Sequence, residues 1–244
     1  MALYQVRISY DGTDFFGFQR QLNCRMVQGE IETAIRKIGW EEISIKGAGR
    51  TDTGVHANGQ VISFSLQWNH STSELLRAMN KHLPNDISAN SAVKPDVGFH
   101  PRYHVTAKTY RYQIYFSPYP EALLERYGWR IWPWINLENL QSISELFVGK
   151  HEFQLFGKPP SKQGATVRTI QSVDWNHARD DRVNFRIVGK SFLYHMVRRI
   201  MFIVIRAGQG RVTPDAILNS LEGKGSLPTG IAPAKGLFLE KVEY

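Results

Sequence analysis

The chain has 244 residues, of which 42% are hydrophobic and 21% charged, a composition typical of folded globular proteins and not of disordered or fibrous ones. Its single cysteine, Cys24, excludes an internal disulfide and any zinc site that needs two or more cysteines. No stretch is apolar over the roughly 18 residues that a membrane span requires. The first residues lack the basic head and apolar core of a secretory signal. We therefore expect a cytoplasmic protein.

The charge of the chain points to a polyanionic partner. Thirty Lys and Arg residues stand against 22 Asp and Glu residues, which gives a net charge of +8 and a pI near 9.6. A positive field of this kind attracts nucleic acid, and much of the binding energy then comes from the release of counterions. Many proteins are mildly basic without binding nucleic acid, so charge alone leaves both interpretations open.

The first half of the chain predicts strand, helix, strand, strand, helix and strand. Apolar residues alternate along the first strand and recur at helical spacing in the first helix. Ser71 and Glu74 form a capping box at the start of the second helix. The six expected ranges are 4–10, 31–38, 43–46, 61–66, 72–83 and 87–93.

The second half predicts the same order. A hairpin is expected around the polar turn 178–181, followed by a long apolar helix over 192–206. Thr213 is a favoured N-cap residue and Pro214 a favoured first-turn residue, so the pair predicts the start of one more helix. The remaining expected elements are a strand at 110–116, a helix at 137–147, the hairpin strands 167–175 and 183–188, and a last strand at 237–242.

Each half therefore has the βαββαβ order of a ferredoxin-like fold. We predict an α+β protein with two such halves, residues 1–104 and 105–244. Their strands are expected to join into one continuous, mixed but mainly antiparallel sheet, with the helices on one side and a basic cleft. The first half contains the segment most suited to catalysis, and the second half is expected to complete the cleft.

That segment is the glycine-rich loop 47–54, which contains Arg50 and Asp52. Side chains two positions apart in an extended stretch lie on the same side, and a neighbouring arginine favours the ionised form of a carboxylate. Asp52 is thus suited to act as a nucleophile or a base; the alternative is a turn in which the carboxylate only caps an amide. Asp-Thr-Gly also occurs in aspartic proteases, but these need two carboxylates that share a proton, and no second such motif is present.

The loop resembles the signature of the TruA family of tRNA pseudouridine synthases. The resemblance continues through collinear segments that together span about residues 4–243. The segments that match the family are Gly49–Ala57, Tyr10–Gln21, Phe99–Arg102, Lys108–Tyr112, Ser191–Arg198 and Gly236–Leu239.

This resemblance implies a pseudouridine synthase fold, and roles for five residues. Asp52 is the catalytic aspartate, which attacks the target uridine or removes its proton, and Arg198 pairs with it. Tyr110 stacks on the base and assists its proton loss, while Leu237 covers the other face. Arg50 occupies the position that the nucleotide leaves when it turns out of the RNA.

The resemblance also implies the substrate and the partners. The family converts uridine to pseudouridine at positions 38, 39 and 40 of the tRNA anticodon stem-loop, as a homodimer and without a cofactor. Outer basic residues are candidates for phosphate contacts: Arg20, Lys108, Arg111, Arg168, Lys190 and Arg199. Pro101 argues against a helix that would place His100 and His104 together, so no metal site is predicted. From the residues alone, the alternative function is a non-catalytic RNA-binding module made of two ferredoxin-like halves.

Overall fold

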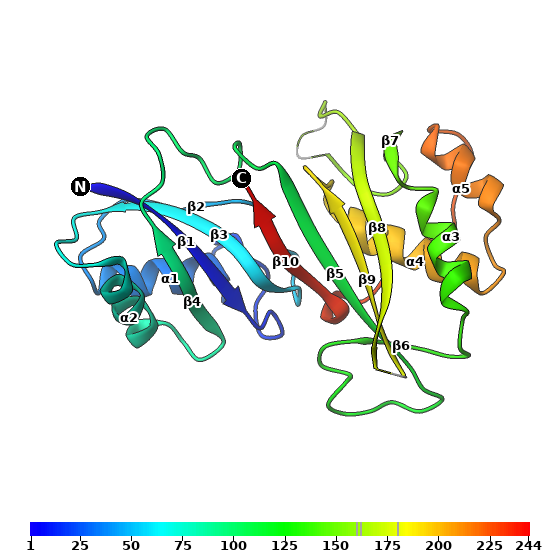
Figure 1. Cartoon of the computed structure of the whole chain (residues 1–244), viewed down its shortest axis with the longest axis horizontal. Coiled ribbons are helices and arrows are strands. Elements are labelled where there is room, and N and C mark those ends of the chain that lie inside the picture. Colours follow the sequence, from blue (N-terminus) through cyan, green and yellow to red (C-terminus); the bar gives the residue numbers. More distant parts are fainter. Residues whose placement is uncertain (160, 162, 180) are drawn as a thin grey trace. The chain divides into compact units, whose positions relative to one another are not determined.

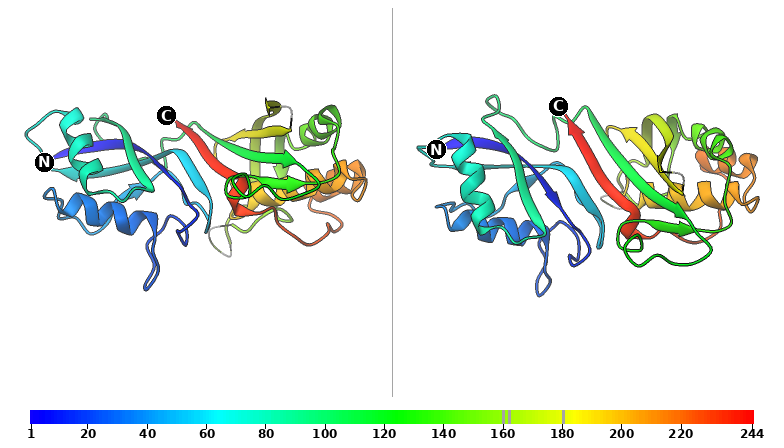
Figure 2. Two further views of the ribbon diagram at one scale, coloured as in Figure 1. Left: turned by 90° about the horizontal axis from the view of Figure 1, so that it is seen from below. Right: turned by 60° about the horizontal axis from the view of Figure 1, so that its bottom comes forward.

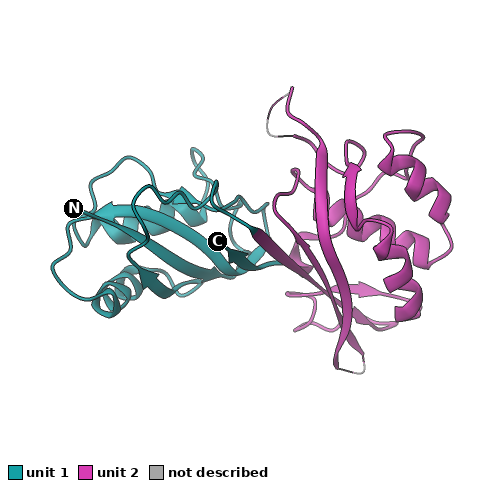
Figure 3. Cartoon of the chain, turned by 45° about the horizontal axis from the view of Figure 1, so that its top comes forward, with its two compact units in different colours: residues 1–106, 238–244 teal, residues 107–237 magenta. Residues whose placement is uncertain are grey.

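The computed structural model describes residues 1–159, 161, 163–179 and 181–244, and the described part is an α+β fold with ten strands and five α-helices. The chain divides into two compact units, shown in Figure 3. Unit 1 comprises residues 1–106 and 238–244, and unit 2 comprises residues 107–237. The predicted α+β class with mainly antiparallel strand pairs is confirmed.

Unit 1 has the predicted order of elements (Figure 1). Strand β1 lies between β4 and β3 and pairs antiparallel with both, and β2 extends β3 on its other edge. The last strand, β10, returns to this unit and pairs parallel with the start of β3, where Phe238 faces His56. The elements are β1 (Ala2–Tyr10), α1 (Val27–Arg36), β2 (Lys46–Gly47), β3 (His56–Leu66), α2 (Thr72–His82), β4 (Ile87–Val93) and β10 (Leu237–Glu243).

The sequence pattern explains the core of unit 1. Tyr4, Val6 and Ile8 alternate along β1 and are fully buried, as a strand with one covered face requires. The capping box of α2 is confirmed: the Glu74 N–H donates to Ser71 Oγ (3.3 Å), and the Ser71 N–H donates to Glu74 Oε2 (2.9 Å). Helices α1 and α2 contact each other, and α2 also contacts β4.

Unit 2 is built on mainly antiparallel strands of the ten-stranded sheet. Its strands follow the order β5–β9–β8–β7, and the short β6 pairs parallel with β5. Helix α3 contacts both α4 and β8, and Figures 1 and 2 show α3, α4 and α5 grouped together. The elements are β5 (Ala107–Phe116), β6 (Trp129–Ile131), α3 (Leu137–Glu145), β7 (Gly149–Glu152), β8 (Val167–Arg179), β9 (Arg182–Gly189), α4 (Met196–Gly208), α5 (Pro214–Leu221) and the 3-10 turn η1 (Ala234–Gly236).

The long helix of unit 2 begins later than its apolar pattern predicts. Helix α4 starts at Met196 and not at Phe192, because His195 has a left-handed backbone with φ of 67°. The residue before it, Tyr194, instead exchanges two backbone hydrogen bonds with Lys158, of 3.0 and 3.2 Å. The hairpin of β8 and β9 is confirmed, although Asp180 of its predicted turn lies outside the described residues.

Two kinds of feature are absent from the part of the chain that the structure describes. None of its helices has both the length and the apolar character needed to cross a membrane. Nor does any group of three or more His, Cys, Asp and Glu side chains come close enough together there to hold a metal ion.

Candidate active site

The loop that carries Asp52 joins β2 to β3 in unit 1 and is held to β3 by a side chain of that strand. Gln60 of β3 donates from Nε2 to the carbonyl of Gly49 (2.9 Å). On the other side of Asp52, the Val55 N–H donates to the Asp52 carbonyl (3.1 Å) and closes a turn. The carboxylate of Asp52 is thus carried by a closed turn, and the residue is half-buried.

A second segment, residues 15–18, forms backbone hydrogen bonds with this loop. The Phe18 N–H donates to the Thr51 carbonyl (3.1 Å), and the Gly54 N–H donates to the Phe15 carbonyl (3.2 Å). These two bonds lie one residue before Asp52 and two residues after it. The backbone of Asp52 is therefore restrained on both sides, which is the kind of support that a catalytic group needs.

Thr51 anchors the same loop to the end of β1. Its Oγ1 lies 2.7 Å from the hydroxyl of Tyr10, a residue that is only 4% exposed at the end of β1. Burial raises the pKa of the Tyr10 phenol, so the group stays neutral as a hydrogen-bond partner. Arg50, one position before Thr51, is exposed. Thr51 is thus anchored, whereas its neighbour Arg50 is exposed.

Glycine is required at two positions where residues 12–17 approach the backbone of the Asp52 loop. A Cβ on Gly12 would lie 2.0 Å from the Val55 carbonyl oxygen, and one on Gly17 would lie 2.8 Å from the Thr51 carbonyl oxygen. Gly17 also has φ of 105°, a backbone conformation that favours glycine. The Gly12 N–H donates to Nδ1 of the buried His56 (3.0 Å), whose ring stacks on Phe238. His56 therefore fixes this contact, a role that its position in the motif alone did not indicate.

A glycine substitution tests how closely the segments must approach. We expect Gly12→Ala to lower the free energy of unfolding by about 3 kcal/mol, because a backbone carbonyl cannot move away from the added methyl group. Gly29→Ala is the matched control: it lies in α1 with nothing within 4 Å of the new Cβ, and should raise stability by about 0.5–1 kcal/mol. Urea unfolding followed by circular dichroism measures both. Equal effects of the two substitutions would contradict the described contact.

In unit 2, Tyr110 lies on β5 in a position fixed by an aromatic neighbour. Its side chain is 9% exposed, and its ring meets the ring of Phe192 edge-to-face, with centroids 5.1 Å apart and an angle of 85° between the planes. Phe192 follows β9 in the segment that leads into α4. The tyrosine predicted to contact the base is therefore held by a residue of the same motif region that contains Arg198.

Arg198 lies on α4 and is fastened to the segment that precedes β10. Its Nε donates to the Ala232 carbonyl (2.8 Å), and the Ala232 N–H donates to the Arg198 carbonyl (3.1 Å). The hydroxyl of Tyr112 donates to the neighbouring Pro233 carbonyl. Burial raises the pKa of Tyr112 well above its usual value, against the opposing effect of the Arg198 charge.

The same segment continues through η1 to Leu237, the residue predicted to cover the base. Leu237 is 4% exposed, and a Cβ on Gly236 before it would lie 2.6 Å from the ring of Tyr112. Tyr112, Arg198 and residues 232–237 therefore form one packed group in unit 2. Asp52 and Arg50 belong to unit 1, so the pairing of Asp52 with Arg198 stays a prediction.

Two of the outer basic residues in unit 2, Arg111 and Arg168, have partners within the protein. The guanidinium of Arg111 donates to Gln113 Oε1 (3.1 Å), and that of Arg168 donates to the carbonyls of Ala165 and Val167 (2.8 and 2.7 Å). Burial lowers the pKa of Arg168. Lys190 is exposed and Lys108 is half-buried. A phosphate contact by any of them stays a prediction.

Arg20 and Arg199 are engaged more extensively. Arg20 donates to the carboxylate of Glu32, a side chain with no exposed surface. Arg199 donates to the carbonyl of Gly230 (2.7 Å) and lies over the ring of Phe202. Burial lowers the pKa of Arg199. These internal roles cannot be predicted from the sequence, since Glu32 and Gly230 lie 12 and 31 residues from their arginines in the chain.

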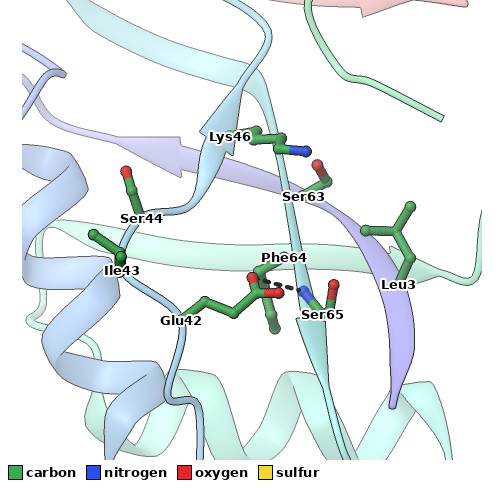
Figure 4. A pocket seen from close by; sticks show the side chains of 8 residues that line it. All are labelled: Leu3, Glu42, Ile43, Ser44, Lys46, Ser63, Phe64 and Ser65. Atoms are coloured by element: carbon green, nitrogen blue, oxygen red, sulfur yellow. Dashed lines mark hydrogen bonds between the residues drawn. The ribbon is translucent and has the colours of Figure 1, made fainter. Parts of the chain in front are cut away.

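A separate cavity of about 470 Å³ opens on the sheet of unit 1 (Figure 4). Glu42 lies at one end, where its Oε2 accepts the Ser65 N–H (3.3 Å), and Lys46 points toward Ser63 at the other. None of the predicted site residues lines this cavity. The residues that do are Leu3, Glu42, Ile43, Ser44, Lys46, Ser63, Phe64 and Ser65.

Comparison with known proteins identifies the family. A family model described as tRNA pseudouridine synthase matches residues 7–104 and 143–244. The chain is 36% identical over 247 residues to tRNA pseudouridine synthase A of Bacillus sp. (strain KSM-64), covering 100% of both chains. It is 39% identical over 239 residues to the protein of that name from Thermotoga petrophila, covering 97% of both. The chain therefore belongs to the tRNA pseudouridine synthase A (TruA) family, whose members act as enzymes on tRNA.

Proposed function

We propose that this tRNA pseudouridine synthase acts on the anticodon stem-loop, at positions 38, 39 and 40, with Asp52 as its catalytic nucleophile or base. The observation that carries the proposal is the restraint on the Asp52 loop: backbone hydrogen bonds from Phe18 and Gly54 hold it on both sides of a half-buried carboxylate. A group fixed in this way loses little entropy when the substrate arrives, which is a main source of catalytic rate.

The reaction itself is an isomerisation. The bond between N1 of uracil and C1′ of the ribose breaks, the base turns, and C5 bonds to C1′. The proton on C5 then leaves, and N1, which keeps the electron pair of the broken bond, takes up a proton. Substrate and product contain the same atoms, so no cofactor or co-substrate is part of the proposal. Asp52 either attacks the uridine or removes a proton from it, and both routes require the ionised carboxylate near an extruded nucleotide.

Extruding a nucleotide from structured RNA costs a few kcal/mol, which the enzyme offsets with contacts to the base. We assign Tyr110 to one face of the uracil and Leu237 to the other, since both are held in fixed positions in unit 2. We assign Arg198 to the pairing with the Asp52 carboxylate. Arg50, which is exposed, fills the space that the nucleotide leaves.

Tritium release measures both the reaction and its location. The purified protein, without added metal or nucleotide, is incubated with unmodified tRNA labelled with tritium at C5 of uracil. Release is expected from tRNAs in which uridine occurs at position 38, 39 or 40, and is expected to disappear when all three are cytidine. Unchanged release from the cytidine variant would contradict the anticodon assignment while leaving the family's activity intact.

Binding to tRNA should depend strongly on salt. The net charge of +8 favours phosphate contacts that release counterions, so affinity should fall by about 10³-fold or more between about 50 and 200 mM salt if six or more phosphates are contacted. Filter binding over this range gives the slope. An affinity that does not change with salt would contradict the proposed role of the basic residues in binding tRNA.

We further propose that the enzyme works as a homodimer in the cytoplasm. Unit 2 offers exposed aromatic surface of the kind enriched at protein interfaces, since Trp132 is 54% exposed and Trp134 is 45% exposed. Sedimentation equilibrium gives the mass in solution directly. A single species of about 28 kDa at micromolar concentration would contradict the dimer, because the chain has a mass of 27.9 kDa.

A further inference from the structure

Unit 1 buries one carboxylate completely, that of Glu32 on α1, with no exposed side-chain surface. Its partners are three donors: the guanidinium Nη1 of Arg20, Nε2 of Gln28 (2.8 Å) and the backbone N–H of Ile45 (3.1 Å). A carboxylate buried without such partners would be strongly destabilising. The full set of donors indicates a site built around this one charge.

Gln28, one turn earlier on α1, connects the site to the segment that holds the Asp52 loop. Its Oε1 accepts the N–H of Arg20 (3.1 Å), and its own N–H donates to the Phe18 carbonyl (2.9 Å). Its Nε2 also reaches Ser44 Oγ (2.8 Å). Residues 18–20 are thus fastened to the helix through both the backbone and the side chains.

Phe18 then transmits this position to the loop. Its N–H donates to the Thr51 carbonyl (3.1 Å), and its ring is so close to Gly47 that a Cβ there would lie 2.8 Å from Cε1. The peptide bond that joins Thr51 to Asp52 therefore rests on a segment whose place depends on Arg20, Gln28 and Glu32.

We propose that Glu32 and Arg20 are positioning residues, which set the location of Asp52 through residues 17–20. The proposal rests on the catalytic role of Asp52 proposed above. It gives Arg20 a partner within the protein, although the arginine side chain is 45% exposed and was predicted from sequence to contact phosphate. An ion pair is more demanding in its geometry than apolar packing, so it fixes the register of the segment on the helix.

The two possible roles of Arg20 predict different kinetics. A positioning residue acts on the chemical step, and a displacement of the loop by about 1 Å can lower the rate about 100-fold without weakening binding. A phosphate contact acts on affinity and lowers the salt slope of binding by about one. The dissociation constant for tRNA and the single-turnover rate at saturating enzyme therefore separate them.

The test compares Arg20→Ala, Glu32→Gln and the double variant. Arg36→Ala is the control: Arg36 is an exposed arginine on α1, the helix that carries Glu32, and its guanidinium lies over the ring of Trp40. We expect each single variant to lower the single-turnover rate about 10- to 100-fold with tRNA affinity within twofold of wild type. The double variant should lose less than the product of the two single effects, because one interaction is removed twice. Arg36→Ala should leave both quantities unchanged.

A rescue experiment covers the variants that fold poorly. Arg20→Lys restores a cation and should recover part of the rate, and added guanidinium ion should speed Arg20→Ala but not the double variant, in which the buried carboxylate is gone. Normal single-turnover rates in both single variants, or a weakened affinity with a normal rate in Arg20→Ala, would overturn the proposal. Asp52→Asn is measured beside them: if that variant stays active, the catalytic assignment fails, whereas the effect of Arg20 and Glu32 on the rate remains readable by itself.

Discussion

Asp52→Asn is expected to abolish pseudouridine formation, with a rate lowered by more than about 1,000-fold, and to leave tRNA affinity within severalfold of wild type. The amide keeps the size of the carboxylate but can neither attack the uridine nor accept its proton. The backbone bonds that hold the loop come from Phe18 and Gly54, not from the Asp52 side chain, so the loop should keep its place. Single-turnover tritium release and filter binding measure the two quantities.

The control for this substitution is Asp96→Asn, an exposed aspartate of the same unit. It makes the same chemical change and the same change in net charge, but at a position with no proposed role in the reaction. We expect wild-type rates from it. Near-normal turnover in Asp52→Asn would show that the carboxylate is not required, and the Asp-Thr-Gly turn would then be only a structural one.

Tyr110→Phe is expected to have the second largest effect, a rate about 100-fold lower with little change in affinity. The ring should keep its contact with Phe192 and its stacking on the base, while the hydroxyl that assists proton loss is removed; acid–base groups of this kind contribute about 10²–10⁴-fold. Tyr110→Ala should weaken tRNA binding as well, because base stacking contributes about 1–3 kcal/mol.

Tyr119→Phe, at a tyrosine of unit 2 that is 76% exposed, is the matched control. It should have wild-type activity and affinity. If Tyr110→Phe is fully active and Tyr110→Ala is not, the tyrosine only stacks on the base, and another group receives the proton. The proposed role in proton loss would then be wrong.

Much of the fold follows from patterns that a single sequence displays. Alternation predicts β1, and the capping box at Ser71 and the proline at position 214 mark the starts of α2 and α5. These signals are local: a strand with one buried face and a helix with a satisfied first turn need only nearby residues. The predicted strand 87–93 has the bounds of β4, Ile87–Val93.

The errors occur where distant residues decide the structure. The apolar pattern from Phe192 is helical, but Tyr194 pairs with Lys158 and His195 adopts a positive φ, so α4 begins only at Met196. Strands β6 and β7 have three and four residues and are too short to show periodicity. The return of β10 to pair with β3 in unit 1 also depends on contacts far apart in the chain.

The candidate site divides in the same way. The residues of the family motifs could be named from the sequence, since each motif is contiguous. The interaction between Arg20 and Glu32 could not be predicted. The sequence of a helix does not show that one of its glutamates is buried when the burial comes from a contact with another segment, here residues 17–20. The same applies to the carbonyls that Arg198 and Arg199 bind, which lie about 30 residues away in the chain.

A structure of the Asp52→Asn variant bound to an anticodon arm tests the central claim most directly. The proposed function predicts one uridine turned out of the RNA, with the side chain at position 52 within about 3.5 Å of the uridine atom that it attacks or deprotonates. The ring of Tyr110 should stack on the uracil of that same nucleotide. A stem-loop with its uridines still stacked, or an extruded uridine that contacts Tyr110 while position 52 faces only solvent, would contradict the claim.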